Sequence, residues 1–394
     1  MEQYDAIVIG AGVIGASVAY HLARFGAGRV LVLERGSIGA GTSSQSSGIL
    51  RTHYTVAENV KLARASWRIF ENFAGYLDDD DASAGLVRCG YLIAAPEGTK
   101  LDALREGLAG QRVQGISVLE LDAKEAASLL PIARFEDAAL IGYEPEAGFG
   151  DAYLVASSFA RAARRLGVKI MEGVEVTGLV REGSRVRGVN TSAGQFGAGV
   201  VVSAQNIWAR SLQEWTGVAT PVSAERHSVL ALEGPRAYDF TMPVYKDLGS
   251  TGMLYCRSYG GAQMLVSEGL AGETLATPDN EQADIPLDYV LEVGAQVAAR
   301  FPSFAEAGLA SSWTGVYDVT PDWNPVLGRL PGIDGLVVGY GFSGHGFKLS
   351  PAIGRVLAQE ALRQPTDVSL APYALERFGT GRLLTGKYGV GAVS

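Results

Sequence analysis

The sequence predicts an α/β plus α+β fold, and three observations support this prediction. Residues 5–36 have the pattern of a buried strand, a glycine turn, a helix and a second strand, as at the start of a parallel sheet. From residue 90 a strand and polar helical stretches follow, strand and helix patterns of the first kind return at residue 149, and mostly alternating segments occupy residues 222–268. A last strand, glycine turn and helix follow residue 313. We therefore expect a Rossmann-like nucleotide-binding domain that is interrupted by a substrate domain with a large, mainly antiparallel sheet.

The predicted domain boundaries follow these changes of pattern. A chain of 394 residues is long enough for two or three domains with large cores. The nucleotide-binding domain is expected to comprise residues 1–88, 149–217 and 313–394, the last including a C-terminal tail. The substrate domain is expected to comprise residues 89–148 and 218–312.

The first glycine turn has the features of a dinucleotide fingerprint. Gly10 permits a tight turn, Gly12 lets a pyrophosphate approach the backbone, and Gly15 allows the helix to lie close to the strand. Glu34 ends the second strand, where a carboxylate accepts hydrogen bonds from a ribose diol and repels a 2′-phosphate. The pattern predicts FAD or NAD rather than NADP. The alternative interpretation is an incidental glycine-rich turn.

Two further segments are suited to holding such a cofactor. The loop from Gly36 to Gly48 consists largely of glycine and serine, and it fits either a chain that wraps a cofactor or a plain flexible loop. A second glycine turn, Gly341–Gly346, opens the last helix and can direct backbone N–H groups at an anionic group. The predicted cofactor-binding residues are Gly10, Gly12, Val13, Ile14, Gly15, Glu34, Arg35, Thr42, Ser43, Ser47, Gly48, Ile49, Val174, Gly344, His345, Gly346, Phe347 and Lys348.

Composition limits the partners and the location of the protein. The net charge of −9 argues against nucleic acid as a partner, because binding to phosphate backbones requires a basic surface. The apolar stretch 6–23 contains patterned glycines and predicts a buried strand and helix rather than a transmembrane segment. Cys89 and Cys256 lie far apart, which predicts core thiols in a reducing, cytoplasmic compartment and no metal site.

Four motifs together resemble the D-amino-acid-oxidase superfamily, and within it the sarcosine oxidases and related secondary-amine dehydrogenases. They are the first fingerprint with Glu34, the loop GTSSQSSGILR at 41–51, the segment 317–322 and GFSGHGFKLS at 341–350. The resemblance implies FAD and the oxidation of an amino acid or secondary amine to an imine, by hydride transfer to flavin N5. Oxygen or another acceptor would then reoxidise the flavin.

The resemblance assigns three residues to the substrate. It places Arg51 and Lys348 on the substrate carboxylate, for which an arginine fork and a lysine near a helix start are well suited. Tyr317 falls where the family has an active-site hydroxyl. The alternatives are a surface ion pair for Arg51, a solvated helix position for Lys348 and core packing for Tyr317. For His345 we expect the backbone to matter more than the imidazole.

The departures from the family pattern are also informative. Gly315 and Gly150 stand where relatives attach flavin through cysteine or histidine, which predicts noncovalent FAD. Met264 replaces the lysine that activates oxygen, which weakens the oxidase interpretation. Glu268 replaces a histidine and would suit a substrate with a second cationic group.

Two other functions stay open at this stage. An NAD-dependent dehydrogenase would share the first fingerprint, although it would not explain the second glycine turn. A flavin-carrying subunit that needs a partner for activity would share all the cofactor residues. The sequence also leaves open whether the chain forms an oligomer.

Overall fold

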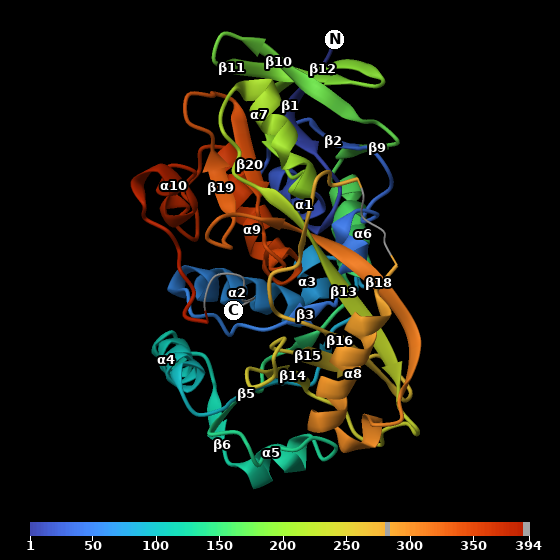
Figure 1. The fold of residues 1–394 in the computed structure, drawn as a ribbon. Coiled ribbons are helices and arrows are strands. Elements are labelled where there is room, and N and C mark those ends of the chain that lie inside the picture. Colours follow the sequence, from blue (N-terminus) through green and yellow to red (C-terminus); the bar gives the residue numbers. More distant parts are fainter. Residues whose placement is uncertain (280–283, 389–394) are drawn as a thin grey trace.

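The computed structural model describes residues 1–279 and 284–388 and contains two large sheets. The chain passes repeatedly between them, so that each sheet is assembled from segments far apart in the sequence. In Figure 1 the sheet with the first strand lies in the upper half of the view, and the second sheet with α8 lies in the lower half. The long strands β13 and β18 extend from the centre of the molecule into the lower half (Figure 1).

The first sheet has eight strands in the order β10-β11-β12-β1-β2-β9, with β20 beside β12 and β19 beside β20. The central pairs β12-β1, β1-β2, β2-β9 and β12-β20 are parallel, whereas the outer pairs are antiparallel. The strands are β1 (Glu2–Ile9), β2 (Val30–Glu34), β9 (Lys169–Glu172), β10 (Val176–Glu182), β11 (Arg185–Thr191), β12 (Gly194–Ser203), β19 (Val326–Arg329) and β20 (Leu336–Tyr340).

Apolar helices cover one face of this sheet. Helix α1 is buried on nearly all sides because it lies against the sheet and also packs against α6 and α9. Gly354 of α9 permits close approach to α1, since a methyl group there would clash with Ser17. The helices of this half are α1 (Val13–Arg24), α2 (Ala57–Glu71), α3 (Phe73–Leu77), α6 (Ala152–Arg165), α7 (Ser211–Thr216), α9 (Gly346–Ala361) and α10 (Arg377–Thr380).

The second sheet has nine strands in the order β17-β13-β16-β15-β14-β5-β7-β6, with β18 also paired to β13. All its pairs are antiparallel except β14-β5. The strands are β5 (Tyr91–Ala95), β6 (Leu119–Leu121), β7 (Leu140–Glu144), β13 (Ser223–Glu233), β14 (Val244–Asp247), β15 (Tyr255–Ser258), β16 (Gln263–Ser267), β17 (Glu273–Leu275) and β18 (Gly308–Val319). Strand β18 therefore continues past the boundary expected at residue 312.

Helix α8 (Leu287–Arg300) packs on the outer face of this sheet, where Val293 and Val297 are fully buried. Helices α4 (Thr99–Val113) and α5 (Ala123–Leu129) flank the strands β5 to β7. A small third sheet joins the two halves and consists of β3 (Ile49–Leu50), β8 (Gly148–Phe149) and β4 (Val87–Arg88). Short 3₁₀ turns occur at Thr42–Gln45, Asn206–Arg210, Pro302–Phe304 and Ala371–Tyr373.

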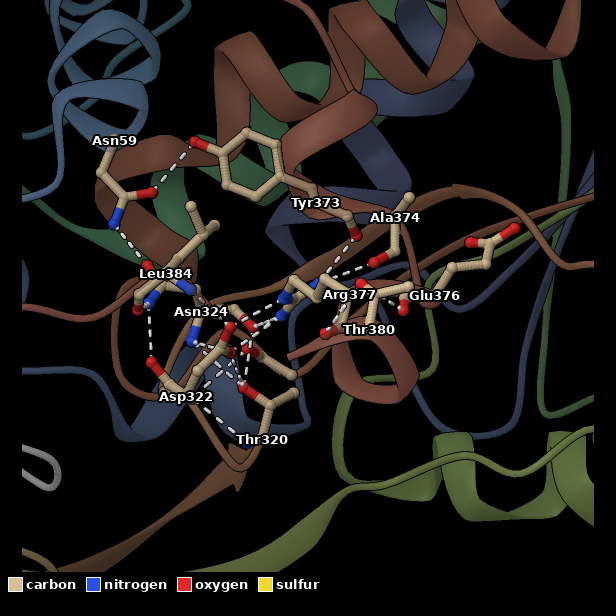
Figure 2. Close-up of polar contacts among 12 residues, drawn as sticks. Asn59, Thr320, Asp322, Asn324, Tyr373, Ala374, Glu376, Arg377, Thr380 and Leu384 are labelled. Carbon is tan, nitrogen blue, oxygen red and sulfur yellow. Dashed lines mark hydrogen bonds and ion pairs between the residues drawn. The ribbon is translucent and has the colours of Figure 1, made fainter. Parts of the chain in front are cut away.

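A buried polar cluster fastens the C-terminal segment to the turn after β18 (Figure 2). The guanidinium of Arg377 binds both carboxylate oxygens of Asp322, at 2.7 and 2.9 Å, and it also donates to the carbonyl of Asn324. Asn59 of α2 donates to the Asn324 side chain and accepts from the hydroxyl of Tyr373. The cluster thus connects three segments that are distant in sequence.

Within the described residues, every helix is too short or too polar to span a membrane.

Candidate active site

A cavity of about 730 Å³ lies between the two sheets. It extends from the first glycine turn, past the loop after β2, to the second glycine turn and the start of α9. Both halves of the molecule contribute to its wall. Of the predicted site residues, those lining it are Gly10, Gly12, Val13, Ile14, Glu34, Arg35, Thr42, Ser43, Ser47, Ile49, Arg51, Val174, Tyr317, Gly344, Gly346, Phe347 and Lys348.

The first turn is built around three glycines with different environments. Gly10 has a φ of +95°, and a side chain there would meet the carbonyl of Ala204 at 2.8 Å. Gly15 does not line the cavity, and a methyl group there would clash with the carbonyl of Gly10. Gly15 therefore sets the close packing of α1 on β1, whereas Gly12 keeps the cavity side of the helix start free of side-chain atoms.

Two side chains brace this turn from the following segments. Glu34 at the end of β2 accepts hydrogen bonds from the backbone N–H of Ala11 at 2.7 Å and of Gly36 at 2.8 Å. The Ser43 hydroxyl accepts from the N–H of Val13 at 3.2 Å. A carboxylate has about four acceptor positions, so Glu34 keeps capacity for a ribose diol while it holds the turn.

The end of the cavity near Glu34 is closed by the predicted residues Arg35 and Thr42 together with Trp208, Asp279 and Asn206. The roles of Trp208 and Asp279 were not predicted. The guanidinium of Arg35 lies 3.9 Å from the ring centre of Trp208 and forms an ion pair of 3.2 Å with Asp279. The indole of Trp208 also donates to Asp279, at 2.8 Å. Asn206 has a φ of +52°, and its side-chain oxygen accepts from Thr42 at 3.2 Å. Asparagine tolerates this left-handed conformation better than most residues with a side chain do.

Asp318 holds the second glycine turn. It lies at the end of β18, is 1% exposed, and accepts from the N–H of Gly341 at 2.5 Å. Its backbone carbonyl accepts from the N–H of Ser343 at 3.1 Å. Burial raises the pKa of Asp318 to about 7, although the backbone hydrogen bonds from the turn oppose this rise. Gly344 must lack a side chain because a methyl group would meet the Tyr317 ring at 2.5 Å.

The structure leaves three predicted cofactor residues outside the cavity wall: Gly15, described above, and His345 and Gly48. The backbone N–H of His345 is already used inside the turn, where it donates to Phe342 at 2.8 Å, and its buried ring packs edge-on against Tyr54. Gly48 has a φ of +73°, and a side chain there would clash with Gly150. His345 and Gly48 therefore stabilise the second glycine turn and the loop after β2 without facing the cavity. Gly344, Gly346 and Ser47 line the cavity instead.

Three basic side chains converge on the end of the cavity near α9. Arg51 follows β3, Lys348 is in the first turn of α9, and Lys246 belongs to β14 of the second sheet; they are 5, 8 and 5% exposed. Arg51 donates to the carbonyl of His53, and its guanidinium lies 4.7 Å from the ring centre of Tyr54. Lys348 donates to the carbonyl of Gly344 at 3.3 Å. Sequence reasoning predicted Arg51 and Lys348 and missed Lys246.

The charges of these groups interact. Burial lowers the pKa of Lys246 to about 7, with a further contribution from Arg51. Burial and the positive charges of Arg51 and Lys246 lower the pKa of Lys348 well below its ordinary value. An anionic group placed among them would reverse these shifts, so the arrangement favours the binding of carboxylates.

A chain of buried hydrogen bonds supports the segment that carries Arg51. Glu144 of β7 accepts from the backbone N–H and the hydroxyl of Thr52, both at 2.7 Å, and from Gln111 at 3.2 Å. The two ring nitrogens of His53 contact Gln111 at 2.7 Å and the hydroxyl of Tyr388 at 2.8 Å. Burial raises the pKa of Glu144 to about 6, against the hydrogen bonds from Thr52. His53 is thus held on both sides within the scaffold.

Aromatic side chains complete the cavity wall near these basic groups. Tyr317 stacks on His227 with the ring centres 3.9 Å apart, and Tyr255 and Tyr91 also line the cavity. His227 has no hydrogen-bond partner at Nε2 among the described residues, and burial lowers the pKa of its imidazole to about 4. His227 is therefore neutral at physiological pH.

The structure places Met264 and Glu268 away from the cavity, which corrects the positions expected for them. Met264 points to the opposite face of the second sheet and packs with Val293 and Val297 of α8. Successive side chains of a strand alternate between faces, so it is Leu265 that faces the first half, where it packs with Val229. Glu268 is half-buried and accepts from Gln296 of α8 at 3.3 Å.

The cavity fits an extended dinucleotide such as FAD. Glycine turns with open helix starts stand at both ends, Glu34 lies beside the first turn, and the walls between them include Val174 and Ile49. Gly315 lines the cavity with no atom that could bond covalently to a flavin. These features are consistent with a noncovalently held cofactor.

Comparisons with known proteins agree with this site. The model of a family described as FAD dependent oxidoreductase matches residues 5–360. The chain is 28% identical over 401 aligned positions to a protein of Arthrobacter sp named sarcosine oxidase subunit beta, covering 100% of this chain and 95% of the relative.

Solved structures show the same arrangement. Glycine oxidase from Geobacillus kaustophilus superposes with a TM-score of 0.82 at 27% identity, covering 96% of this chain and 99% of that chain. L-proline dehydrogenase from P. horikoshii superposes with a TM-score of 0.88 at 24% identity, covering 97% of this chain and 99% of that chain. This similarity shows a shared fold.

Proposed function

Because the chain belongs to the DAO family of FAD-dependent oxidoreductases, we propose that it oxidises the C–N bond of an amino acid or secondary amine to an imine. The observation that carries this proposal is the position of Arg51 and Lys348, two buried cations on the cavity wall beside the second glycine turn. The names of its relatives, which include sarcosine and glycine oxidases, support a substrate with both an amine and a carboxylate.

Arg51 and Lys348 would fix the substrate through its carboxylate. Arginine offers two parallel N–H donors to the two carboxylate oxygens, and lysine adds a point charge from the helix start. Bound FAD would supply the acceptor for a hydride from the carbon next to nitrogen. The contribution of the protein is then orientation, because a held substrate presents one C–H bond at a fixed position.

Tyr317 and His227 would exclude water and limit the size of the group on the substrate nitrogen. Their stacked rings form a flat wall, and burial raises the pKa of Tyr317 well above its ordinary value, so the phenol stays protonated. A neutral wall does not hold the ammonium form of the substrate, which favours the neutral amine that the reaction requires.

The decisive experiment is anaerobic mixing of the purified holoenzyme with D-, L-, cyclic and N-methyl amino acids while flavin absorbance is recorded. We expect at least one amino acid to bleach the flavin, and oxygen is then readmitted to identify the acceptor. Fast recovery with peroxide would indicate an oxidase, and slow recovery would indicate a dehydrogenase with another acceptor.

Two outcomes would replace this proposal. A purified protein without flavin that reduces NAD would identify an NAD-dependent dehydrogenase. A yellow protein whose flavin no amine reduces would identify a flavin-carrying subunit, and the similarity to a protein named a beta subunit gives this second function its support. Adding candidate partner chains to the same assay would then restore bleaching.

A further inference from the structure

We propose that Lys246 is a specificity residue that binds a second carboxylate, so that the preferred substrate is an amino acid or N-substituted glycine with two carboxylates. This inference rests on the proposed function, because it names the substrate class of the same cavity. It departs from the expectation, based on Glu268, of a substrate with a second cationic group. Glu268 faces α8, whereas Lys246 lines the cavity.

The position of Lys246 supports this role. Its strand β14 lies in the second sheet, so it approaches the cavity from the half opposite to Arg51 and Lys348. The ammonium donates to the carbonyl of Met253 at 2.7 Å and lies 5.6 Å from the ring centre of Tyr255. Gly269 leaves the space that the ammonium fills, since a methyl group there would clash with Nζ.

The charges of the side chains around this end of the cavity indicate the same substrate class. Within the described chain, Lys246 and Lys348 each have a backbone carbonyl as hydrogen-bond partner rather than a carboxylate. Glu144 lies behind Arg51 and contributes to its electrostatic environment. With one substrate carboxylate between Arg51 and Lys348, Lys246 would keep only a backbone carbonyl as its hydrogen-bond partner, and its lowered pKa would favour loss of its proton. A second carboxylate beside Lys246 would stabilise its protonated form.

An alternative role for Lys246 is to assist the reaction of reduced flavin with oxygen, in place of the lysine that is missing from β16. The site favours a carboxylate because Lys246 lies on the same cavity wall as Tyr91 and Tyr255 and is close enough to Arg51 for their charges to interact. The experiment below separates the two roles.

Binding of inert acids tests the inference without any need for turnover. Calorimetry on the holoenzyme would compare acetate and propionate with malonate, succinate and glutarate. We expect at least one of the dicarboxylates to bind about tenfold or more tightly than either monocarboxylate, a difference of about 1.4 kcal/mol. K246M keeps most of the aliphatic stem but removes the ammonium and should abolish the preference, whereas K246R should retain part of it.

Lys100 provides the matched control. It lies on α4 close enough to affect Lys246 electrostatically, but its ammonium donates to the carbonyl of Leu248 and it does not line the cavity. K100M removes the same charge and should keep the preference for dicarboxylates. FAD content and melting temperature of each variant establish that the site is intact.

Two results would overturn the inference: equal affinity of the wild type for both classes of acid, or an unchanged preference in K246M. If K246M instead slowed only the reoxidation of reduced flavin by oxygen, the oxygen role would replace it. Failure of the proposed function is a different result. A Lys246-dependent preference for dicarboxylates in a protein whose flavin no amine reduces would keep the binding site and reject the oxidation.

Discussion

Arg51 combines burial with a position on the cavity wall, and its removal has a specific expected effect. R51A should raise the half-saturating substrate concentration about 10- to 100-fold, because a hydrogen-bonded charge contributes about 1.5–3 kcal/mol. FAD should stay bound, since Arg51 lies at the end of the cavity away from Glu34 and the first glycine turn. Steady-state kinetics and the flavin absorbance of the purified variant measure both effects.

R51K is the control that keeps the positive charge but lacks the paired N–H donors of arginine. Its half-saturating substrate concentration should fall between those of R51A and the wild type. A half-saturating concentration that does not change in R51A would contradict the assignment of Arg51 to the substrate carboxylate.

The low pKa of Lys246 predicts that carboxylate binding depends on pH. An anion binds the protonated lysine, and the free protein has this pKa near 7, so the proton must be taken up from solvent above that pH. The contribution of Lys246 to the dissociation constant of a dicarboxylate should therefore be constant below pH 7 and rise by up to about tenfold per pH unit above it, in addition to the contribution of Lys348, whose pKa is also lowered. Calorimetry between pH 6 and pH 9 measures this slope. A K246M protein should lose this contribution, and a slope equal to that of the wild type would contradict it.

At the scale of single residues, motifs predicted the site better than local patterns did. Arg51 and Lys348 belong to long, specific motifs, and the structure places both on the cavity wall. Lys246 occurs in a strand of four residues, which is too short for an alternating pattern to reveal which side chains face inward. Met264 was misplaced because an error of one residue in a strand moves a side chain to the other face of the sheet.

Among the elements, the second glycine turn depends on a residue outside it. D318A would leave the N–H of Gly341 without its carboxylate acceptor in a buried place and should cost about 1–3 kcal/mol. Because this turn lines the cavity, FAD content should fall together with the melting temperature. The ratio of flavin to protein absorbance and thermal unfolding measure the two effects.

D318N is the informative control, because its amide oxygen can still accept one backbone hydrogen bond. It should retain more FAD than D318A does. Full FAD content in D318A would show that the turn holds its shape without Asp318.

The first elements of the chain followed from the sequence because they are formed by a local pattern. The strand, turn and helix at 5–36 were predicted in full, and β1, α1 and β2 occupy them. The domain boundary expected at residue 312 falls inside strand β18. This strand pairs along its length with β13, far earlier in the chain, and such long-range pairing leaves no local signal. The Thr52–Glu144–Gln111 hydrogen bonds were missed for the same reason.

The molecule as a whole is tied together by the cluster around Arg377 (Figure 2). Arg377 and Asp322 have side-chain exposures of 3 and 1%, so R377A leaves a buried carboxylate without its partner. We expect a loss of about 3–5 kcal/mol in the free energy of unfolding. Urea denaturation measures this loss.

R363A gives the comparison, because Arg363 forms an exposed ion pair with Asp334 and its loss should cost less than about 1 kcal/mol. Equal stability of R377A and R363A would contradict a structural role for the cluster.

Because the chain crosses between the two sheets, residues with different expected roles in the cavity come from different halves of the protein. Arg51, Lys348 and both glycine turns come from the half that holds the cofactor, whereas Lys246 comes from a strand of the other half. Under the proposed role of Lys246, exchange of this one side chain on β14 would change the class of substrate while the residues that bind the cofactor stay the same. For an engineer, β14 is the place to begin a library of new substrate preferences.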